Sequence, residues 1–440
     1  MGNIPEIDFK QLRMTNREVL RFAEALAAAA PDLVRVGSIG NTREGTPIVL
    51  LTITDFADRQ EKFGYFVQGN IHSHELGGTL AGLYLARQLV ADHRPGGILS
   101  QTVFYIIARC NPDGAERIAL HSGSERSAWG AAVDEPNRIA PCDIDDNGRI
   151  YAMRVICDDG DMIRDPASPE FCMIGRREGD SGPYYRHLPE GMIENWDGHT
   201  IPAWNDFARA YEDWNRNWPT FWHHAQFGAG TAPLSEPEVR LQADFLETHP
   251  EIIGGLAFHN GWGACLTPPN TCHALPENDQ KFFDRLAEIA SAYTGYPAYR
   301  SIHFGGGDTL HECFGQFPDY CFYERKFHCM LIELGTIENS AGLATDAVMN
   351  LHDTYTAPYA VLALQQRRPE LEPAIIPWKK FEHPQLGEVE IGGLDVPVFA
   401  NPTPEDRQKV ARGCYLYMLE HIKLAVKHFS EESGRKRIIK

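Results

Sequence analysis

Positive charge is scarce in this sequence. Its 440 residues include 41 Lys and Arg against 60 Asp and Glu, which gives a formal net charge of −19. Because nucleic-acid binding needs a basic face, this balance argues against a nucleic-acid partner. No apolar run is long enough to span a bilayer, and residues 1–8 have neither the basic segment nor the apolar core of a secretory signal. These absences predict a cytoplasmic protein that works without a membrane.

The ten cysteines include no Cys-x-x-Cys pair. Several of them, such as Cys110, Cys329 and Cys414, lie in strand or helix contexts, where cysteine serves as a small apolar residue. The sequence therefore indicates neither a disulfide framework nor a structural zinc knuckle.

Short apolar runs rich in β-branched and aromatic residues are typical of buried strands. Four such runs cover residues 65–68, 102–108, 252–258 and 329–332. Helical patterns alternate with them: one follows a Thr15-Asn-Arg-Glu18 capping box, one covers residues 77–90, one follows a second capping box, Ser235-Glu-Pro-Glu238, and a last one covers about residues 403–429. The alternation predicts an α/β fold, with a mixed central sheet covered by helices on both faces, as a single domain over residues 1–440.

Polar residues follow three of these strand-like runs. His72 and Glu75 follow the first run, His259 the third and Glu333 the fourth. Side chains at the carboxyl ends of such strands line the crevice where open α/β sheets bind ligands. Catalytic Zn²⁺ takes three protein ligands and keeps a fourth position open. The pattern predicts one Zn²⁺ per chain held by His72, Glu75 and His259, with Glu333 as a carboxylate beside the metal that accepts a proton from water.

Taken singly, each of these four residues is more often a buried, hydrogen-bonded polar residue without a ligand. Their joint placement favours the metal site. A binding protein on the same fold, without activity, is the non-enzymatic alternative, and it predicts the loss of a ligand or of the base. The sequence keeps all four residues.

The order and context of these residues resemble the zinc metallocarboxypeptidases of the carboxypeptidase A type. The resemblance covers about residues 36–393. His72 and Glu75 match the His-x-x-Glu ligand pair of that family, His259 matches its later ligand histidine, and Glu333 in Ile-Glu-Leu-Gly matches its catalytic glutamate. The resemblance implies a zinc-dependent hydrolase that acts on peptide bonds.

The same resemblance implies roles for five further residues. Asn215 and Arg216 match the pair that binds the free C-terminal carboxylate of a peptide substrate. Arg126 matches the arginine that stabilises the oxyanion, and Asp213 falls where the family orients its first ligand histidine. One position departs from the family, because His311 stands where a mobile tyrosine is common. A histidine there could still donate a hydrogen bond to the substrate from the glycine-containing loop of residues 305–315.

Residues of about 130–202 form an Asp-rich insertion relative to shorter members of this family. Asp143, Asp145 and Asn147 place oxygen atoms at alternate positions before a glycine, as calcium loops do, but Arg154 stands where an EF-hand has its last acid. Polar turns closed by Asx side chains are the favoured interpretation, and a Ca²⁺ site is the alternative.

These observations predict a zinc carboxypeptidase that hydrolyses the C-terminal amide bond of a peptide or peptide-like substrate. The alternative enzyme is a zinc amidohydrolase for a non-standard amide, such as a cell-wall peptide or an N-acyl amino acid. The residues before Asp319 include no acid that would select a terminal Lys or Arg, so the sequence does not identify the preferred side chain.

Overall fold

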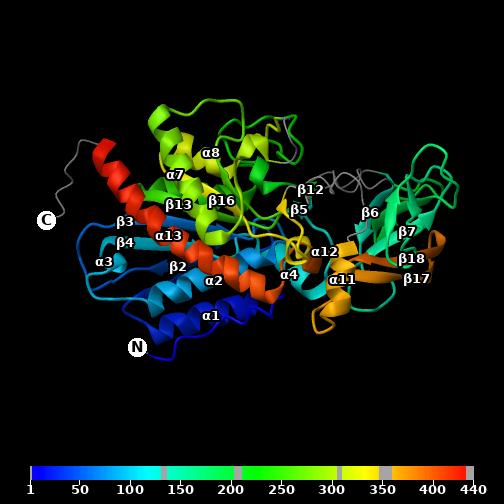
Figure 1. Cartoon of the computed structure of the whole chain (residues 1–440), viewed down its shortest axis with the longest axis horizontal. Helices are drawn as coiled ribbons and strands as arrows, with labels where there is room; N and C mark the ends of the chain where they lie inside the picture. The colour runs from blue at the N-terminus through cyan, green and yellow to red at the C-terminus, as the bar shows by residue number, and fades with distance from the viewer. Residues whose placement is uncertain (1, 130–135, 203–210, 305–309, 346–358, 433–440) are drawn as a thin grey trace.

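The computed structural model describes residues 2–129, 136–202, 211–304, 310–345 and 359–432. Its main body is built on an eight-stranded sheet (Figure 1). In spatial order, the strands are β1 (Val34–Asn41), β2 (Pro47–Ile53), β4 (Thr102–Ile107), β3 (Phe63–Gly69), β13 (Ile252–His259), β16 (His328–Glu333), β14 (Ala264–Thr267) and β15 (Ala298–Arg300). The four central strands are parallel, whereas β1–β2, β2–β4 and β14–β16 are antiparallel pairs. The sheet is therefore mixed, as predicted.

The central strands are apolar because both of their faces are covered. On β3, Tyr65 and Val67 belong to the core on one face, and Phe66 between them belongs to the core on the other face. Successive side chains of a strand point to opposite faces, so a strand buried on both sides reads as a continuous apolar run. All four predicted strands are confirmed, as β3, β4, β13 and β16.

Helices cover both faces of the sheet. The first face packs against α1, α2, α7 and α13, and the second against α6 and α8. Figure 1 shows α13 crossing the sheet beside α2 and α7, with which it makes many contacts. The helices are α1 (Asn16–Ala29), α2 (Leu76–Ala91), α3 (Ile98–Gln101), α4 (Pro112–His121), η1 (Trp214–Arg216), α6 (Pro237–Thr248), α7 (Glu277–Thr294), η2 (Ser301–His303), α8 (Phe317–Tyr323), α9 (Ile337–Ser340), α11 (Tyr359–Arg367), α12 (Val396–Phe399) and α13 (Pro404–Glu432).

The four predicted helices are present as α1, α2, α6 and α13, but one predicted cap is wrong. The Thr15–Glu18 capping box of α1 is confirmed. Helix α6 begins one residue later than a Ser235 cap requires, with Glu236 at the cap position and no side-chain cap. Pro237 is the reason, because a proline with a fixed φ suits the first helical position. Ser235 instead receives a hydrogen bond from Asn217 Nδ2 at 3.0 Å.

The predicted insertion forms much of a second lobe, at the right of Figure 1. A six-stranded sheet contains, in spatial order, β17 (Ile375–His383), β18 (Gly387–Leu394), β7 (Ala152–Ile156), β10 (Tyr185–Pro189), β8 (Met162–Arg164) and β9 (Met173–Gly175). Two short pairs add β6 (Arg138–Pro141) with β11 (Gly191–Glu194), and β5 (Ala128–Trp129) with β12 (Tyr211–Glu212). Because β18 pairs with β7, the lobe combines the insertion with a hairpin from the C-terminal part of the chain.

This lobe has a hydrophobic core of its own, in which Val155 of β7 packs with Val389 and Ile391 of β18. Residues 130–135, at the start of the predicted insertion, lie outside the described residues. The assignment of residues 1–440 to one domain stays a prediction. In the part of the chain that the structure describes, no helix has both the length and the apolar character that a membrane span requires.

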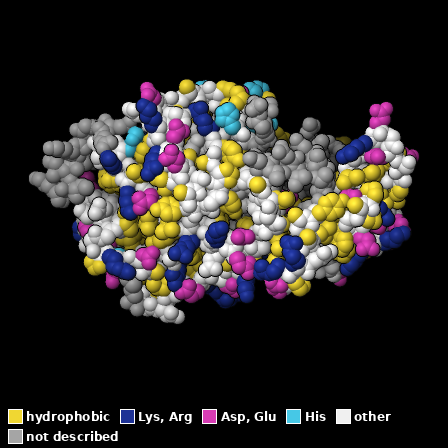
Figure 2. All heavy atoms as spheres, in the orientation of Figure 1, with side chains coloured by type: hydrophobic (Ala, Val, Ile, Leu, Met, Phe, Trp, Pro, Cys, Tyr) yellow, Lys and Arg dark blue, Asp and Glu magenta, His cyan; other side chains and the backbone are white. Residues whose placement is uncertain are grey.

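Both signs of charge are spread over the surface of the molecule. In Figure 2, Lys and Arg side chains alternate with Asp and Glu side chains across the visible face. A mixed surface of this kind, together with the net negative charge of the chain, does not favour the binding of a polyanion.

Close packing of α2 against the sheet generates a first prediction, which concerns Gly82. An added Cβ there would lie 2.9 Å from both Cα and Cβ of Ala108. Helix propensity alone would make Gly82→Ala stabilising by about 1 kcal/mol, but overpacking costs about 1–3 kcal/mol. We therefore expect a lower free energy of unfolding in urea titration. The control is Gly37→Ala, because no atom lies near the added Cβ; a stabilised Gly82→Ala protein would contradict the packing argument.

Candidate metal centre

The carboxyl ends of three parallel strands bring the predicted metal ligands together. β3 ends at Gly69 and leads into the turn that carries His72 and Glu75. His259 is the last residue of β13 and Glu333 is the last residue of β16, and the two are partners in the parallel register. The fold thus places these residues at the edge of the sheet where α/β proteins bind ligands.

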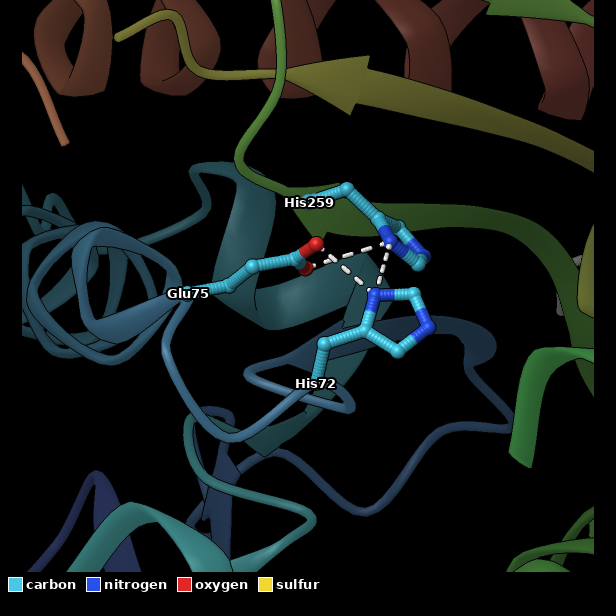
Figure 3. A group of neighbouring side chains, drawn as sticks. All are labelled: His72, Glu75 and His259. Carbon is cyan, nitrogen blue, oxygen red and sulfur yellow. Dashed lines mark hydrogen bonds and ion pairs between the residues drawn. The ribbon is translucent and has the colours of Figure 1, made fainter. Parts of the chain in front are cut away.

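Three side chains point toward one another at this edge (Figure 3). His72 Nδ1 lies 2.7 Å from Glu75 Oε1. His259 Nδ1 lies 3.2 Å from His72 Nδ1 and 3.2 Å from Glu75 Oε2. All three side chains are buried, with at most 3% of their surface exposed. Donor atoms at this spacing could hold one metal ion.

The turn between β3 and α2 is held in place by its own side chains. Asn70 has a left-handed backbone, with φ of 58°, which asparagine adopts at less cost than most residues. Its Nδ2 donates to His72 O at 2.7 Å, and its Oδ1 accepts from Thr79 Oγ1 at 2.9 Å. Glu75 occupies the cap position of α2, where the helix dipole favours a negative charge. The turn therefore presents both ligands from a fixed backbone.

The donor set fits a divalent ion of the zinc type. Imidazole nitrogens together with a carboxylate are typical ligands of catalytic zinc, whereas Mg²⁺ and Ca²⁺ prefer oxygen ligands. Burial opposes ionisation of Glu75, but His72 and His259 outweigh it and hold its pKa well below its usual value. The carboxylate is thus in the form that a ligand requires. Glu75 Oε2 is buried and lies 3.2 Å from His259 Nδ1, so an ion bound between them could take both atoms as ligands.

Asp213 lies behind His72 and links it to two arginines. Its Oδ1 is 3.1 Å from His72 Nε2, a contact that fixes the ring with Nδ1 toward the other ligands. Its Oδ2 accepts from Arg126 Nε at 3.0 Å and lies 3.8 Å from Arg216 Nη1. Burial opposes the charge of Asp213, but Arg126, Arg216 and His72 outweigh it and hold its pKa well below its usual value.

Arg126 lies between the metal ligands and Asp213. Its Nη1 is 3.7 Å from Glu75 Oε1, and about a third of the side chain, 36%, is exposed. Burial acts against the charged form, but Asp213 and Glu75 raise the pKa of Arg126 above its usual value. A fixed positive charge therefore stands beside the candidate metal centre.

Glu333 lies beside the three ligands and stays separate from them. Burial raises its pKa to about 7, against the effect of His259, and Glu75 adds to the rise. Gly261 makes room for the carboxylate, because a Cβ at that position would lie 2.6 Å from Glu333 Oε2. Nothing in the sequence marks Gly261, since only its contact with Glu333 in the folded chain distinguishes it from other glycines.

The residues assigned to the substrate carboxylate adjoin one another. Arg216 ends η1, and its Nη1 donates to Asn215 O at 2.9 Å. Asn215 is buried: its Nδ2 donates to Gln316 Oε1 at 2.6 Å, and its Oδ1 accepts from the N–H of Phe317 at 2.9 Å. Gln316 carries no sequence signal of this contact, because it lies 101 residues from Asn215 along the chain.

His311 is the one predicted site residue for which the structure shows no link to this group. Its backbone N–H donates to Ile302 O at 2.8 Å, and its side chain is exposed. Residues 305–309 of the loop that carries it lie outside the described residues. The substrate-binding role of His311 stays a prediction.

The Asp-rich loop of the insertion uses its carboxylates for its own backbone. Asp143 Oδ1 and Asp145 Oδ1 accept from the N–H of Asn147 at 3.1 and 3.2 Å, and Asp143 Oδ2 accepts from the N–H of Gly148 at 2.7 Å. Glu190, which the sequence did not indicate, lies beside them, and both of its oxygens also accept backbone N–H groups. These contacts are those of polar Asx turns, and the calcium alternative gains no support from them.

These features define the class of protein. A mixed α/β sheet presents two imidazoles and a carboxylate to one ion, with a further carboxylate beside them, which is the arrangement of a metal-dependent hydrolytic site. The sequence model of the zinc carboxypeptidase family matches residues 19–149 and 197–360, and the chain belongs to this family. The gap in the match, residues 150–196, falls within the predicted insertion.

Solved structures of low sequence identity share the fold. Bovine thrombin-activatable fibrinolysis inhibitor, in complex with tick carboxypeptidase inhibitor, superposes with a TM-score of 0.52 at 13% identity, over 94% of this chain and 99% of that chain. The carboxypeptidase A of Helicoverpa armigera gives a TM-score of 0.53 at 15% identity, over 96% of this chain and 75% of that chain. At these identities, the likeness establishes the fold alone.

Similarity to curated relatives is confined to one segment. Carboxypeptidase Z of Mus musculus is 27% identical over 119 residues, which are 26% of this chain and 18% of the relative. Carboxypeptidase D of Homo sapiens is 32% identical over an alignment of 120 residues, which covers 21% of this chain and 9% of the relative. The matched segment thus spans less than a fifth of either relative.

The contact between Asp213 and His72 generates a second prediction. Asp213→Asn should weaken zinc binding by roughly 10- to 100-fold, because the amide no longer fixes the imidazole as a charged acceptor does. Competition with a chromophoric chelator measures this affinity. Asp244→Asn, at an exposed position of α6, is the matched control and should bind zinc as the unmodified protein does. Equal affinities for the two variants would show that Asp213 does not support the metal centre.

Proposed function

We propose that this protein is a zinc-dependent carboxypeptidase, which hydrolyses the amide bond before the free C-terminal carboxylate of a peptide or peptide-like substrate. His72, Glu75 and His259 would hold one Zn²⁺ at the catalytic centre. Membership of the zinc carboxypeptidase family and the convergence of the three ligands support this function.

The observation that carries the proposal is the pairing of His259 with Glu333. The two residues end adjacent parallel strands in register, so a ligand and a candidate base stand side by side. A carboxylate whose pKa lies near 7 can accept a proton from water and return it within one reaction. A protein that only bound zinc for stability would need neither the base nor the space that Gly261 leaves for it.

Each group around the centre would carry out a different step of the hydrolysis. Zinc, when bound, would polarise the scissile carbonyl and lower the pKa of water. Glu333 takes the proton of the attacking water and delivers it to the leaving amine. Arg126, held by Asp213 and partly exposed, supplies positive charge where the oxyanion of the tetrahedral intermediate develops.

Arg216 and Asn215 would bind the terminal carboxylate of the substrate. The guanidinium group of Arg216 offers a planar pair of donors that matches a carboxylate. Its position is set by bonds to Asn215 O and by the charge of Asp213. Asn215 Nδ2 uses one of its two hydrogens on Gln316, so the other is available for the substrate.

A third prediction tests Glu333 as the base. Glu333→Gln should retain zinc and the fold but lose several orders of magnitude in kcat, because an amide cannot accept the proton of water. Peptide hydrolysis and zinc content, measured on the same sample, check this. Gly261→Ala is the companion variant: its Cβ displaces the carboxylate, so it should lower kcat and retain zinc. Near-normal turnover of Glu333→Gln would assign the base to another group.

A fourth prediction concerns the substrate carboxylate. Peptides with an amidated C-terminus should be cleaved at least about 100-fold more slowly than the free acids, because Arg216 loses an ionic partner worth about 3 kcal/mol. Arg216→Ala should remove this preference by slowing the free acids. If the unmodified protein cleaves both forms at equal rates, the enzyme is an amidohydrolase that does not require a terminal carboxylate.

A further inference from the structure

A second group of side chains that could bind a metal lies at the opposite end of β16. Asp279 is in the first turn of α7, His328 begins β16, and His428 lies near the end of α13. Their donor atoms all lie within 4.8 Å of one another. Because β16 runs from His328 to Glu333, this group is about 16 Å from the catalytic centre along the strand.

The donor atoms of the second group are close enough to share one ion. Asp279 Oδ1 is 2.8 Å from His328 Nε2 and 3.8 Å from His428 Nε2. Ligand atoms around a tetrahedral zinc ion lie about 3.3 Å apart when the bonds are about 2.0–2.1 Å. Shifts of less than an ångström would place all three atoms at bonding distance from one ion.

Aromatic packing fixes both imidazoles in this arrangement. The ring of Phe282 stacks on His428, with centroids 4.3 Å apart and planes at 21°, and meets the edge of His328 at 4.5 Å. Phe283 and Phe322 also contact the ring of His328, at 4.9 and 5.6 Å. The two imidazoles therefore have little freedom to turn away from Asp279.

Each of the three side chains is largely covered but still reachable from solvent. The exposed side-chain fractions are 16% for Asp279, 10% for His328 and 17% for His428. The three residues line a cavity of about 300 Å³, together with Lys326 and Tyr323. An ion held by three protein ligands could keep water in its fourth position on the side of this cavity.

We propose that Asp279, His328 and His428 form a second binding site for a zinc-type divalent ion, distinct from the catalytic centre. Two imidazoles and one carboxylate favour Zn²⁺ and similar divalent metals of intermediate softness over the hard ions Mg²⁺ and Ca²⁺. The ion replaces the proton that Asp279 Oδ1 and His328 Nε2 share in their hydrogen bond. It joins α7, β16 and α13, three elements that are far apart in the sequence, and so stabilises the attachment of the C-terminal helix.

Zinc content tests this proposal on the whole chain of 440 residues, freed of metal with a chelator, reloaded with excess Zn²⁺ and dialysed. Elemental analysis should find about two zinc ions per chain in the unmodified protein and about one in His428→Gln and in Asp279→Asn. Both variants should keep their peptidase activity, because neither residue belongs to the catalytic centre. His121→Gln is the control, because His121 is exposed and belongs to neither of these two groups of candidate ligands. This variant should keep about two zinc ions per chain.

A double variant isolates the second site from the first. His72→Gln with His259→Gln should still bind about one zinc ion, and adding Zn²⁺ should raise its thermal midpoint. Adding His428→Gln to this double variant should abolish both the binding of the remaining zinc ion and the rise in the thermal midpoint. If the unmodified protein holds one zinc ion that His428→Gln and Asp279→Asn retain, or if the double variant binds none, the group is an ion-paired cluster without metal and the proposal fails.

Discussion

The burial of the Glu75 carboxylate between two imidazoles is the interaction on which the catalytic part of this structure depends. Removing a carboxylate from water costs several kcal/mol unless opposite charges and donors replace the lost hydration. His72 and His259 do so from the ends of two different segments, and Arg126 adds a positive charge at 3.7 Å. The parallel pairing of β3 with β13 places the ends of these two strands side by side, and so brings the three charges together. A divalent ion at this point compensates the same charge more completely, so metal binding and folding of this edge favour one another.

The sequence predicted the elements that carry the centre because their signals are local. An apolar run of 4–8 residues that ends in a polar residue identifies β3, β13 and β16 without knowledge of their partners. The His72–Glu75 spacing and the family resemblance then indicated which polar residues belong together. The signal for the Thr15 capping box is also local, and that box is present. The predicted Ser235 cap is wrong, because Pro237 places the start of α6 one residue later.

Features that depend on distant pairing could not be predicted in this way. The hairpin of β17 and β18 completes the sheet of the insertion, although it lies more than 180 residues away along the chain. The alternating pattern of the hairpin predicts strands, but it does not indicate that β18 pairs with β7. Gln316 becomes a partner of Asn215, and Gly261 a neighbour of Glu333, only once the sheet has formed. Asp279, His328 and His428 share no motif, because three separate elements supply them. Sequence periodicity reports which face of an element is buried, but not which element covers it.

Asp213 connects the two tasks proposed for the centre. One of its oxygens orients His72 as a ligand, and the other attracts both Arg126 and Arg216. Without a substrate, this single carboxylate offsets much of the positive charge of the two guanidinium groups. A substrate carboxylate bound at Arg216 would compete for that guanidinium at its longer contact, 3.8 Å, while the 3.0 Å bond to Arg126 stays in place. The unequal distances thus leave Arg216 freer than Arg126 to exchange partners and keep Arg126 fixed beside the three candidate ligands, which is the division that the proposed roles in substrate binding and oxyanion stabilisation would require.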